Sequence, residues 1–192
     1  RDQALTFIGA GHETTAVALT WTWYLLLRHP EVMRQLDAEV RTVSGATPPR
    51  FDDLARLDVT RRSIEEPLRL YPPVVAVVRD VVADDEIGGY RIPARSAVIL
   101  SQYVTHRHPA FWPERSAVCL RLSGTPPHPP FWAEPDRWHA GCLLPDACPQ
   151  RPRFAYFPFL GGPHQCIGAE FAMVEATLIV AAIARRFRLT LV

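Results

Sequence analysis

The order of apolar and polar residues along the chain predicts a protein that is mainly helical. A first helix is expected over about residues 3–29 and a second over residues 31–44. In the second, the apolar positions are three or four residues apart, which is the spacing of one helix face: Val32, Leu36, Val40 and Val43. Gly45 and the following prolines are typical of a helix end.

The rest of the chain alternates between helix, strand and loop signals. Residues 52–70 predict a short helix and then a longer one, closed by Pro72. Residues 74–100 carry β-branched runs between turn signals, which favours short strands, and residues 101–165 are expected to be mostly loop.

The carboxyl-terminal part predicts a last helix, over residues 168–186, and a closing strand over residues 187–192. Four apolar residues are expected on the buried side of that helix: Phe171, Val174, Leu178 and Ile183. Helices therefore dominate, and the fold class is mainly α with a minor β component.

Composition limits the kinds of function that remain open. A chain of 192 residues can form one domain, and 48% hydrophobic with 21% charged residues is ordinary for a globular protein. The net charge of +1 gives no reason to expect a nucleic-acid partner. The four cysteines form no CxxC pair, so zinc-binding spacings are absent. Because the sequence begins without Met inside a helical pattern, we interpret it as a fragment.

One internal repeat interrupts the loop region. Residues 108–114 recur as residues 128–134, with five of seven positions identical at an offset of 20. A single repeat is too short for a repeat architecture. We interpret residues 115–130 as an insertion or a local duplication.

The loop before the last helix carries the strongest chemical signal. Residues 158–168 place Cys166 directly before a helix start, with glycines at 161, 162 and 168. A helix amino terminus offers free N–H groups and a positive dipole, which lower a thiol pKa and favour the thiolate. The glycines would let the backbone lie against a flat ring. The simpler alternative is a buried structural cysteine in a glycine-rich turn.

A second signal lies in the first helix, over residues 10–15. Thr14 can bond the carbonyl of Ala10 and loosen the helix, while Gly11 leaves room for a small ligand. Glu13 and Thr14 together can relay protons through water. The alternative is a kinked helix with incidental polar residues.

A third signal is the pair Glu66 and Arg69, which lie three residues apart on one helix face. Alone, such a pair is a common surface feature worth a few tenths of a kcal/mol, roughly. Pro135–Trp138 supplies a further arginine, Arg137, in a Pro-x-Arg-Trp context.

Taken in this order, these motifs resemble the carboxyl-terminal, haem-binding half of the cytochrome P450 family. The cysteine loop matches the family signature at Phe159, Gly162, His164, Cys166 and Gly168. The resemblance implies haem b with the Cys166 thiolate as axial ligand to the iron. It also implies that Phe159 packs near the sulfur and that His164 bonds a haem propionate.

The same resemblance assigns roles to the other two motifs. It implies that Glu13 and Thr14 deliver protons for O–O cleavage, and that Glu66, Arg69 and Arg137 form a buried structural triad that holds the loop under the haem. Arg79, on a predicted strand, matches the family's propionate-binding arginine. An exposed strand arginine is the alternative there.

Several residues depart from the family pattern. Pro67 lies inside the Glu-x-x-Arg helix, so either the helix kinks at Glu66 or the triad is damaged. Arg95 and Leu160 stand where glycine is usual. His106 has a weaker claim to the haem edge, and we leave it out of the predicted site.

The resulting interpretation covers residues 1–192 as a partial cytochrome P450 domain. It implies a monooxygenase that inserts one oxygen atom of O2 into a small lipophilic organic substrate. Electrons would come from NAD(P)H through a ferredoxin or a flavoprotein reductase, and the cytoplasm is the expected compartment. The main alternative is a non-catalytic, truncated or degenerate remnant with weak or no haem binding. A thiolate-haem isomerase is a further alternative, which the Glu13–Thr14 pair disfavours.

Overall fold

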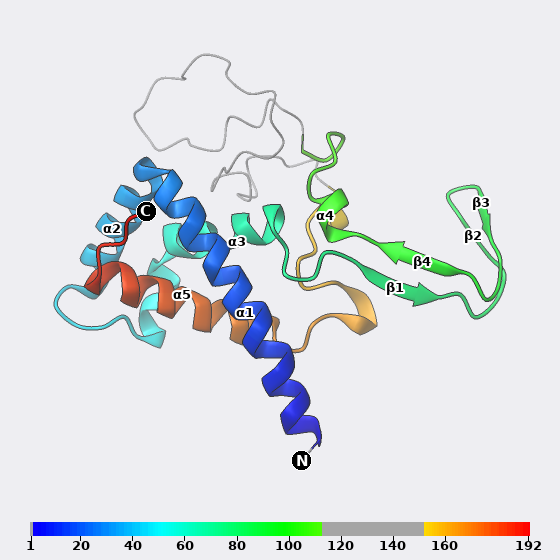
Figure 1. The fold of residues 1–192 in the computed structure, drawn as a ribbon, viewed down its shortest axis with the longest axis horizontal. Coiled ribbons are helices and arrows are strands. Elements are labelled where there is room, and N and C mark those ends of the chain that lie inside the picture. The colour runs from blue at the N-terminus through cyan, green and yellow to red at the C-terminus, as the bar shows by residue number, and fades with distance from the viewer. Residues whose placement is uncertain (1, 113–151) are drawn as a thin grey trace.

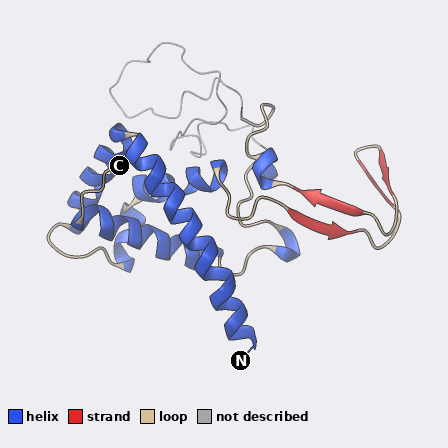
Figure 2. Cartoon of the chain, in the orientation of Figure 1, coloured by secondary structure: helices blue, strands red, loops and turns tan. Residues whose placement is uncertain are grey.

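A computed structural model describes residues 2–112 and 152–192 as a group of helices with a small β region extending from one end (Figure 1). The α-helices are α1 (Asp2–Arg28), α2 (Pro30–Ser44), α3 (Asp58–Leu70), α4 (Gln102–Thr105) and α5 (Ala169–Arg186). Short 3-10 helices are η1 (Phe51–Arg56), η4 (Arg153–Ala155) and η5 (Gly162–His164). The strands are β1 (Val77–Asp80), β2 (Asp85–Ile87), β3 (Tyr90–Ile92) and β4 (Ala97–Leu100). The predicted class, mainly α with a minor β component, is confirmed (Figure 2).

Local sequence explains where α1 and α2 meet and where α2 ends. Pro30 occupies the first turn of α2, where its missing N–H costs nothing and its fixed φ suits a helix. Gly45 follows α2 with a φ of 56°, in the left-handed region that favours glycine, and its N–H donates to the carbonyl of Arg41. The predicted second helix is therefore confirmed at both ends.

The start of α3 is capped by a side chain from α2. The two carboxylate oxygens of Glu39 accept the backbone N–H groups of Val59 and Thr60 at 2.7 and 2.8 Å, and the hydroxyl of Thr60 donates to the same carboxylate at 2.8 Å. A negative charge on free N–H groups is favourable at a helix amino terminus. This contact fixes α3 against α2.

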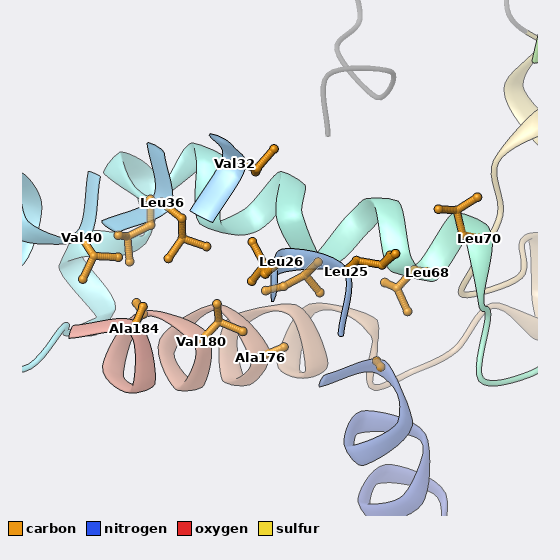
Figure 3. Packing of buried hydrophobic residues seen from close by; sticks show 14 residues of the cluster. Leu25, Leu26, Val32, Leu36, Val40, Leu68, Leu70, Ala176, Val180 and Ala184 are labelled. Carbon is orange, nitrogen blue, oxygen red and sulfur yellow. The ribbon is translucent and has the colours of Figure 1, made fainter. Parts of the chain in front are cut away.

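The core lies where α1, α2, α3 and α5 meet (Figure 3). Leu26, Leu36 and Val180 are fully buried there, one each from α1, α2 and α5. The buried face of α5 differs from the predicted one and consists mainly of small residues, which let the neighbouring helices approach closely: Ala176, Thr177, Val180, Ala181 and Ala184. Of the four predicted residues, Phe171 was placed on this face wrongly, since it is 71% exposed, while Val174, Leu178 and Ile183 are half-buried.

The β region consists of two antiparallel pairs. Strand β1 pairs with β4, with Arg79 opposite Val98, and β2 pairs with β3. Gly88 and Gly89, with φ values of 60° and 83°, form the β2–β3 turn. The expectation of short strands between residues 74 and 100 is confirmed.

The predicted closing strand over residues 187–192 is wrong, because those residues form no strand. The N–H of Phe187 closes the last turn of α5 by donating to Ile183, and Arg188 forms an ion pair with Asp37 of α2. The tail is therefore held beside the helices rather than beside the strands.

Two further expectations concern residues that the structure does not describe. Residues 115–130 and 128–134, the interpreted insertion and the second copy of the repeat, lie outside the described residues. In the part that is described, none of the helices combines the length and apolar character needed to cross a membrane.

Candidate functional site

The Glu66–Arg69 pair forms as the helical spacing predicts. Nε of Arg69 donates to Oε2 of Glu66 at 2.9 Å, and its Nη2 donates to Oε1 at 2.6 Å. Both side chains are buried, with 4% and 0% of their surfaces exposed. A bidentate guanidinium–carboxylate pair satisfies both groups where water cannot. This pair is therefore a buried feature and not the common surface contact.

Pro67 does not prevent this pair. Helix α3 continues through it as one element, so the alternative in which the proline damages the pair does not hold for Glu66 and Arg69. A proline there removes the N–H that would bond Ser63. The helix recovers one turn later, where the N–H of Tyr71 donates to the carbonyl of Pro67 at 2.7 Å.

Arg69 also reaches beyond its own helix. Its Nη1 donates to the backbone carbonyl of His106 at 2.9 Å, and its guanidinium lies over the Trp112 ring, 4.7 Å from the centroid. Arg137, the expected third member of the triad, lies outside the described residues and stays a prediction. In the described chain, the Glu66–Arg69 pair is joined to His106 and Trp112.

His106 is the functional candidate that the sequence interpretation left out. It is fully buried at the end of α4, and its Nε2 accepts the backbone N–H of Phe157 at 2.9 Å. Burial, and then the charge of Arg69, lower the pKa of His106 to about 4. The local sequence His106-Arg107-His108-Pro109 has no periodicity that could have indicated this burial. The contact with a segment 51 residues away appears only in the fold.

Tyr156 and Phe157 begin the segment that leads to the cysteine loop, and both contact the helical support. The Tyr156 hydroxyl donates to the carbonyl of Glu65 at 2.9 Å, while Phe157 bonds His106. Burial raises the pKa of Tyr156, and the negative charges of Glu65 and Glu66 raise it further. The hydroxyl is therefore a neutral donor at any ordinary pH.

The cysteine loop closes on itself through backbone hydrogen bonds. The N–H of Leu160 donates to the carbonyl of Phe157 at 3.0 Å, and the N–H of Cys166 donates to that of Phe159 at 2.9 Å. The Phe159 side chain packs against the helical core. These contacts hold Cys166 at a fixed place ahead of α5, whose amino-terminal cap is Gly168.

The backbone of this loop needs glycine at some positions and is strained at another. A Cβ at Gly161 would lie 2.6 Å from the Phe154 ring, so a side chain there would require the exposed Phe154 ring to move. Gly162 has a φ of 67° in the left-handed region. Leu160 has a φ of 63° in the same region, which is unfavourable for a residue with a Cβ. The departure from glycine noted in the sequence is therefore a site of backbone strain.

Cys166 and His164 are both exposed, as is Ile167 beside them. A Cβ at Gly168 would lie 3.9 Å from the Cys166 sulfur, an ordinary contact distance, so Gly168 lies directly beside the thiol. The alternative of a buried structural cysteine does not hold, because the thiol is open to a ligand. The structure brings Phe159, Cys166 and Gly168 together in one loop, with His164 on η5 at its edge.

Glu13 and Thr14 lie in the first half of α1, where Glu13 is exposed and Thr14 is half-buried. The Thr14 hydroxyl donates to the carbonyl of Ala10 at 2.6 Å, as expected. Thr6, Thr20 and Thr22 make the same bond four residues back, so this contact does not distinguish Thr14 from ordinary helical threonines. A Cβ at Gly11 would meet nothing within 4 Å, which leaves the expected open space beside the motif.

Helix α1 contacts α5 and α3, which places the Glu13–Thr14 motif on the same body as the cysteine loop (Figure 1). Arg79 stands apart on β1. It is half-buried, and its Nη1 donates to the neighbouring carbonyl of Val78 at 2.9 Å. Within residues 2–112 and 152–192 no carboxylate pairs with Arg79, so its charge is available to an acidic group.

The residues present fit a haem better than a bare metal ion. A bare ion takes several ligands from the protein, and the described residues contain no group of three or more His, Cys, Asp or Glu that could supply them. A haem iron needs only an axial ligand from the chain, because the macrocycle supplies the other donors. The exposed Cys166 sulfur is such a ligand, and the exposed apolar residues Ile167 and Phe171 suit a flat apolar ring.

Comparisons with known proteins agree with this geometry. The family model for Cytochrome P450 matches residues 1–117 and 116–192. Cyclooctatin synthase of Streptomyces melanosporofaciens is 43% identical over 98% of this chain and 37% of its own length. Pentalenene oxygenase of Streptomyces avermitilis is 36% identical over 98% of this chain and 38% of its own length. The crystal structure of the cytochrome P450DA heme domain superposes with a TM-score of 0.80 at 34% identity, covering 97% of this chain and 37% of that one.

The fold and the loop thus define a haem-thiolate type of domain. The chain belongs to the cytochrome P450 family. It spans between 29% and 38% of the length of the curated relatives it matches, and 37% in the case of cyclooctatin synthase.

Proposed function

We propose that this chain is the haem-binding portion of a cytochrome P450 monooxygenase and that Cys166 is its iron ligand. The observation that carries the proposal is the position of Cys166. Its sulfur is exposed ahead of α5, on a loop whose entry is bonded to the buried Glu66–Arg69 network through His106. When bound, haem would supply O2 activation, the chemistry that amino-acid side chains cannot perform.

The chain's own residues take four roles in this proposal. The Cys166 thiolate would hold the iron and supply it with electron density. Glu13 and Thr14 would pass protons from water into the site. Arg79 and His164 bind the haem propionates, and Glu66 with Arg69 and Arg137 keeps the loop in place.

The partners follow from the same chemistry. NAD(P)H would supply electrons through a ferredoxin or a flavoprotein reductase, and the substrate would be a small lipophilic organic molecule. Two relatives support that class of substrate, because a cyclooctat-9-en-7-ol 5-monooxygenase and a pentalenene oxygenase are named for an alcohol and a hydrocarbon. We propose the cytoplasm as the compartment.

A second candidate is a non-catalytic remnant that binds haem weakly or not at all. The observation that favours it is backbone strain at Leu160, inside the cysteine loop itself. A loop that must adopt a costly conformation to present its cysteine would hold the iron less firmly.

A spectroscopic experiment separates the two candidates. The chain is mixed with haem, reduced and exposed to CO, and the Soret band is recorded. A thiolate-bound iron gives the long-wavelength band of the family, and Cys166→Ala should abolish it. Cys148→Ala is the matched control, because it removes another thiol and should leave the band unchanged. Absence of the band in the unaltered chain would favour the remnant, and turnover with a surrogate reductase is then the test of catalysis.

A further inference from the structure

His106 connects two segments that lie far apart in the sequence, the end of α3 and the entry of the cysteine loop. The proposed role of Cys166 requires these segments to keep a fixed relative position. The backbone carbonyl of His106 accepts Nη1 of Arg69 at 2.9 Å, and its ring Nε2 accepts the N–H of Phe157 at 2.9 Å. The residue is fully buried, and its ring lies edge-on to Phe157 at 5.1 Å between centroids. One residue therefore links the Glu66–Arg69 pair to the entry of the cysteine loop.

These contacts determine the protonation of the ring. Because Nε2 accepts a hydrogen bond, it carries no proton, and the neutral ring must carry its proton on Nδ1. Within the described chain, Nδ1 has no partner at hydrogen-bond distance. The backbone carbonyls of Arg69 and Leu68, at the end of α3, favour a proton on the ring and partly offset the lowering of the His106 pKa by burial and by the charge of Arg69. The last carbonyls of a helix lack intrahelical partners, so they attract an N–H group.

The charges around the ring favour this neutral form. Arg69 of α3 and Arg107, the next residue in the chain, both oppose a positive charge on His106. Tyr156, whose ring lies 5.2 Å away, is neutral. Glu66 is already paired with Arg69, and Glu65 with Arg61. A protonated ring would also present an N–H at Nε2 to the Phe157 N–H, replacing an attraction with a repulsion.

A short series of backbone hydrogen bonds connects His106 to Cys166. Phe157 donates to the ring and accepts, through its carbonyl, the N–H of Leu160 at 3.0 Å. Phe159, within that turn, accepts the N–H of Cys166 at 2.9 Å. Displacement of Phe157 would therefore move the turn that bonds Cys166.

We propose that His106 is a positioning residue for the iron ligand: its neutral ring, protonated on Nδ1, fixes Phe157 against the end of α3 and so sets the place of Cys166. Its relevance to catalysis rests on the proposed function of Cys166. The link from His106 to Phe157 and the loop does not rest on it, because every contact involved lies within the chain.

Amide hydrogen exchange in the full chain tests the link directly. His106→Leu removes the acceptor for Phe157 while keeping an apolar side chain. Exchange at Phe157, Leu160 and Cys166 should become faster by about tenfold, the factor that corresponds to one net hydrogen bond. His106→Gln places an amide oxygen near the former Nε2 and should restore most of the protection. A general structural role would not predict rescue by an acceptor.

His108→Leu is the matched control. Its Nδ1 also accepts a backbone N–H, that of Ala110 at 3.2 Å, but at an exposed site. This variant should leave exchange at Phe157 and Cys166 unchanged. Equal exchange in the unaltered chain and in His106→Leu would overturn the proposal, as would equal loss of protection in the Leu and Gln variants.

A second measurement needs no variant and covers the case in which His106→Leu does not fold. Nitrogen-15 NMR of the histidine rings identifies which nitrogen carries the proton. The proposal requires Nδ1–H at neutral pH, and an Nε2–H ring would overturn it. Neither measurement depends on haem. If the chain showed the expected protection and ring proton but no thiolate band, the proposed function would fail while the link from His106 to the loop would stand.

Discussion

The two regions that the family resemblance ties to haem chemistry differ sharply in burial. The Glu66–Arg69 pair and His106 are enclosed, and their hydrogen bonds reach α4 and the cysteine loop. In the first half of α1, residues 2–13 are exposed, including Glu13, and Thr14 is half-buried; Phe7 and Ile8 are 60% and 67% exposed there.

This difference in burial separates contacts that are complete within the described chain from a surface that is left uncovered. The enclosed region finds its partners within residues 58–70, 102–112 and 155–166. The exposed part of α1 carries large apolar side chains near the Glu13–Thr14 motif, and such surfaces commonly bind another molecule. A haem above Cys166 would be one such molecule.

The largest expected effect comes from breaking the enclosed region at Arg69. Arg69→Ala leaves the Glu66 carboxylate buried without its partner and removes the donor to His106. Loss of one member of a buried ion pair costs about 3–5 kcal/mol. We expect the free energy of unfolding, measured by urea denaturation, to fall by that amount.

Arg61→Ala is the matched control for this loss. Arg61 lies in the same helix and pairs with Glu65 and Asp58, but 47% of its side chain is exposed. An exposed pair contributes at most about 1 kcal/mol. Equal losses in the two variants would mean that the contrast between enclosed and exposed contacts has no energetic consequence here.

An intermediate effect is expected from pH, through His106. The pKa of His106 is lowered from 6.5 to about 4 by burial and by Arg69, so the unfolded chain binds the proton at higher pH than the folded one. The free energy of unfolding should therefore fall as the pH drops from about 6.5 to about 4, by about 3 kcal/mol in all, and His106 should add no further loss below that.

The contribution of His106 is isolated by difference. His106→Gln should flatten this part of the stability profile between pH 6.5 and 4, because glutamine does not titrate. His108→Gln, which removes an exposed histidine, should leave the slope in place. A profile that stays steep in His106→Gln would show that other groups cause the acid sensitivity.

Periodicity and motif spacing predicted the helices well because those signals are local. The apolar spacing in residues 31–44 and the three-residue spacing of Glu66 and Arg69 each describe one helix face, and the structure contains both. The face of α5 was wrong because burial there depends on how closely other helices approach. Small residues such as Ala181 are buried where Phe171 is not.

The contacts that complete the support could not be predicted from the sequence, because they join distant segments. Glu39 caps α3 from 20 residues away, and His106 meets Phe157 from 51 residues away. Neither residue carries a local pattern that names its partner. Two departures from the family pattern did predict local backbone conformation. Arg95 and Leu160 stand where glycine is usual, and both have positive φ, at 64° and 63°.

The smallest expected effect concerns that strain, at Leu160 inside the cysteine loop. Leu160→Gly removes the Cβ that makes a left-handed conformation costly, by about 1–2 kcal/mol, but gives the unfolded chain more freedom, by about 0.5–1 kcal/mol. The half-buried leucine also loses some apolar contact. We expect a net gain in the free energy of unfolding of about 0.5 kcal/mol.

Arg95→Gly, at an exposed turn with nearly the same φ, lacks the contact loss and should gain slightly more, about 1 kcal/mol. Urea denaturation of the two variants side by side measures both. Destabilisation by Leu160→Gly with a gain from Arg95→Gly would mean that the Leu160 side chain supports the loop more than its backbone strains it. The cysteine loop would then belong with the enclosed region rather than with the exposed one.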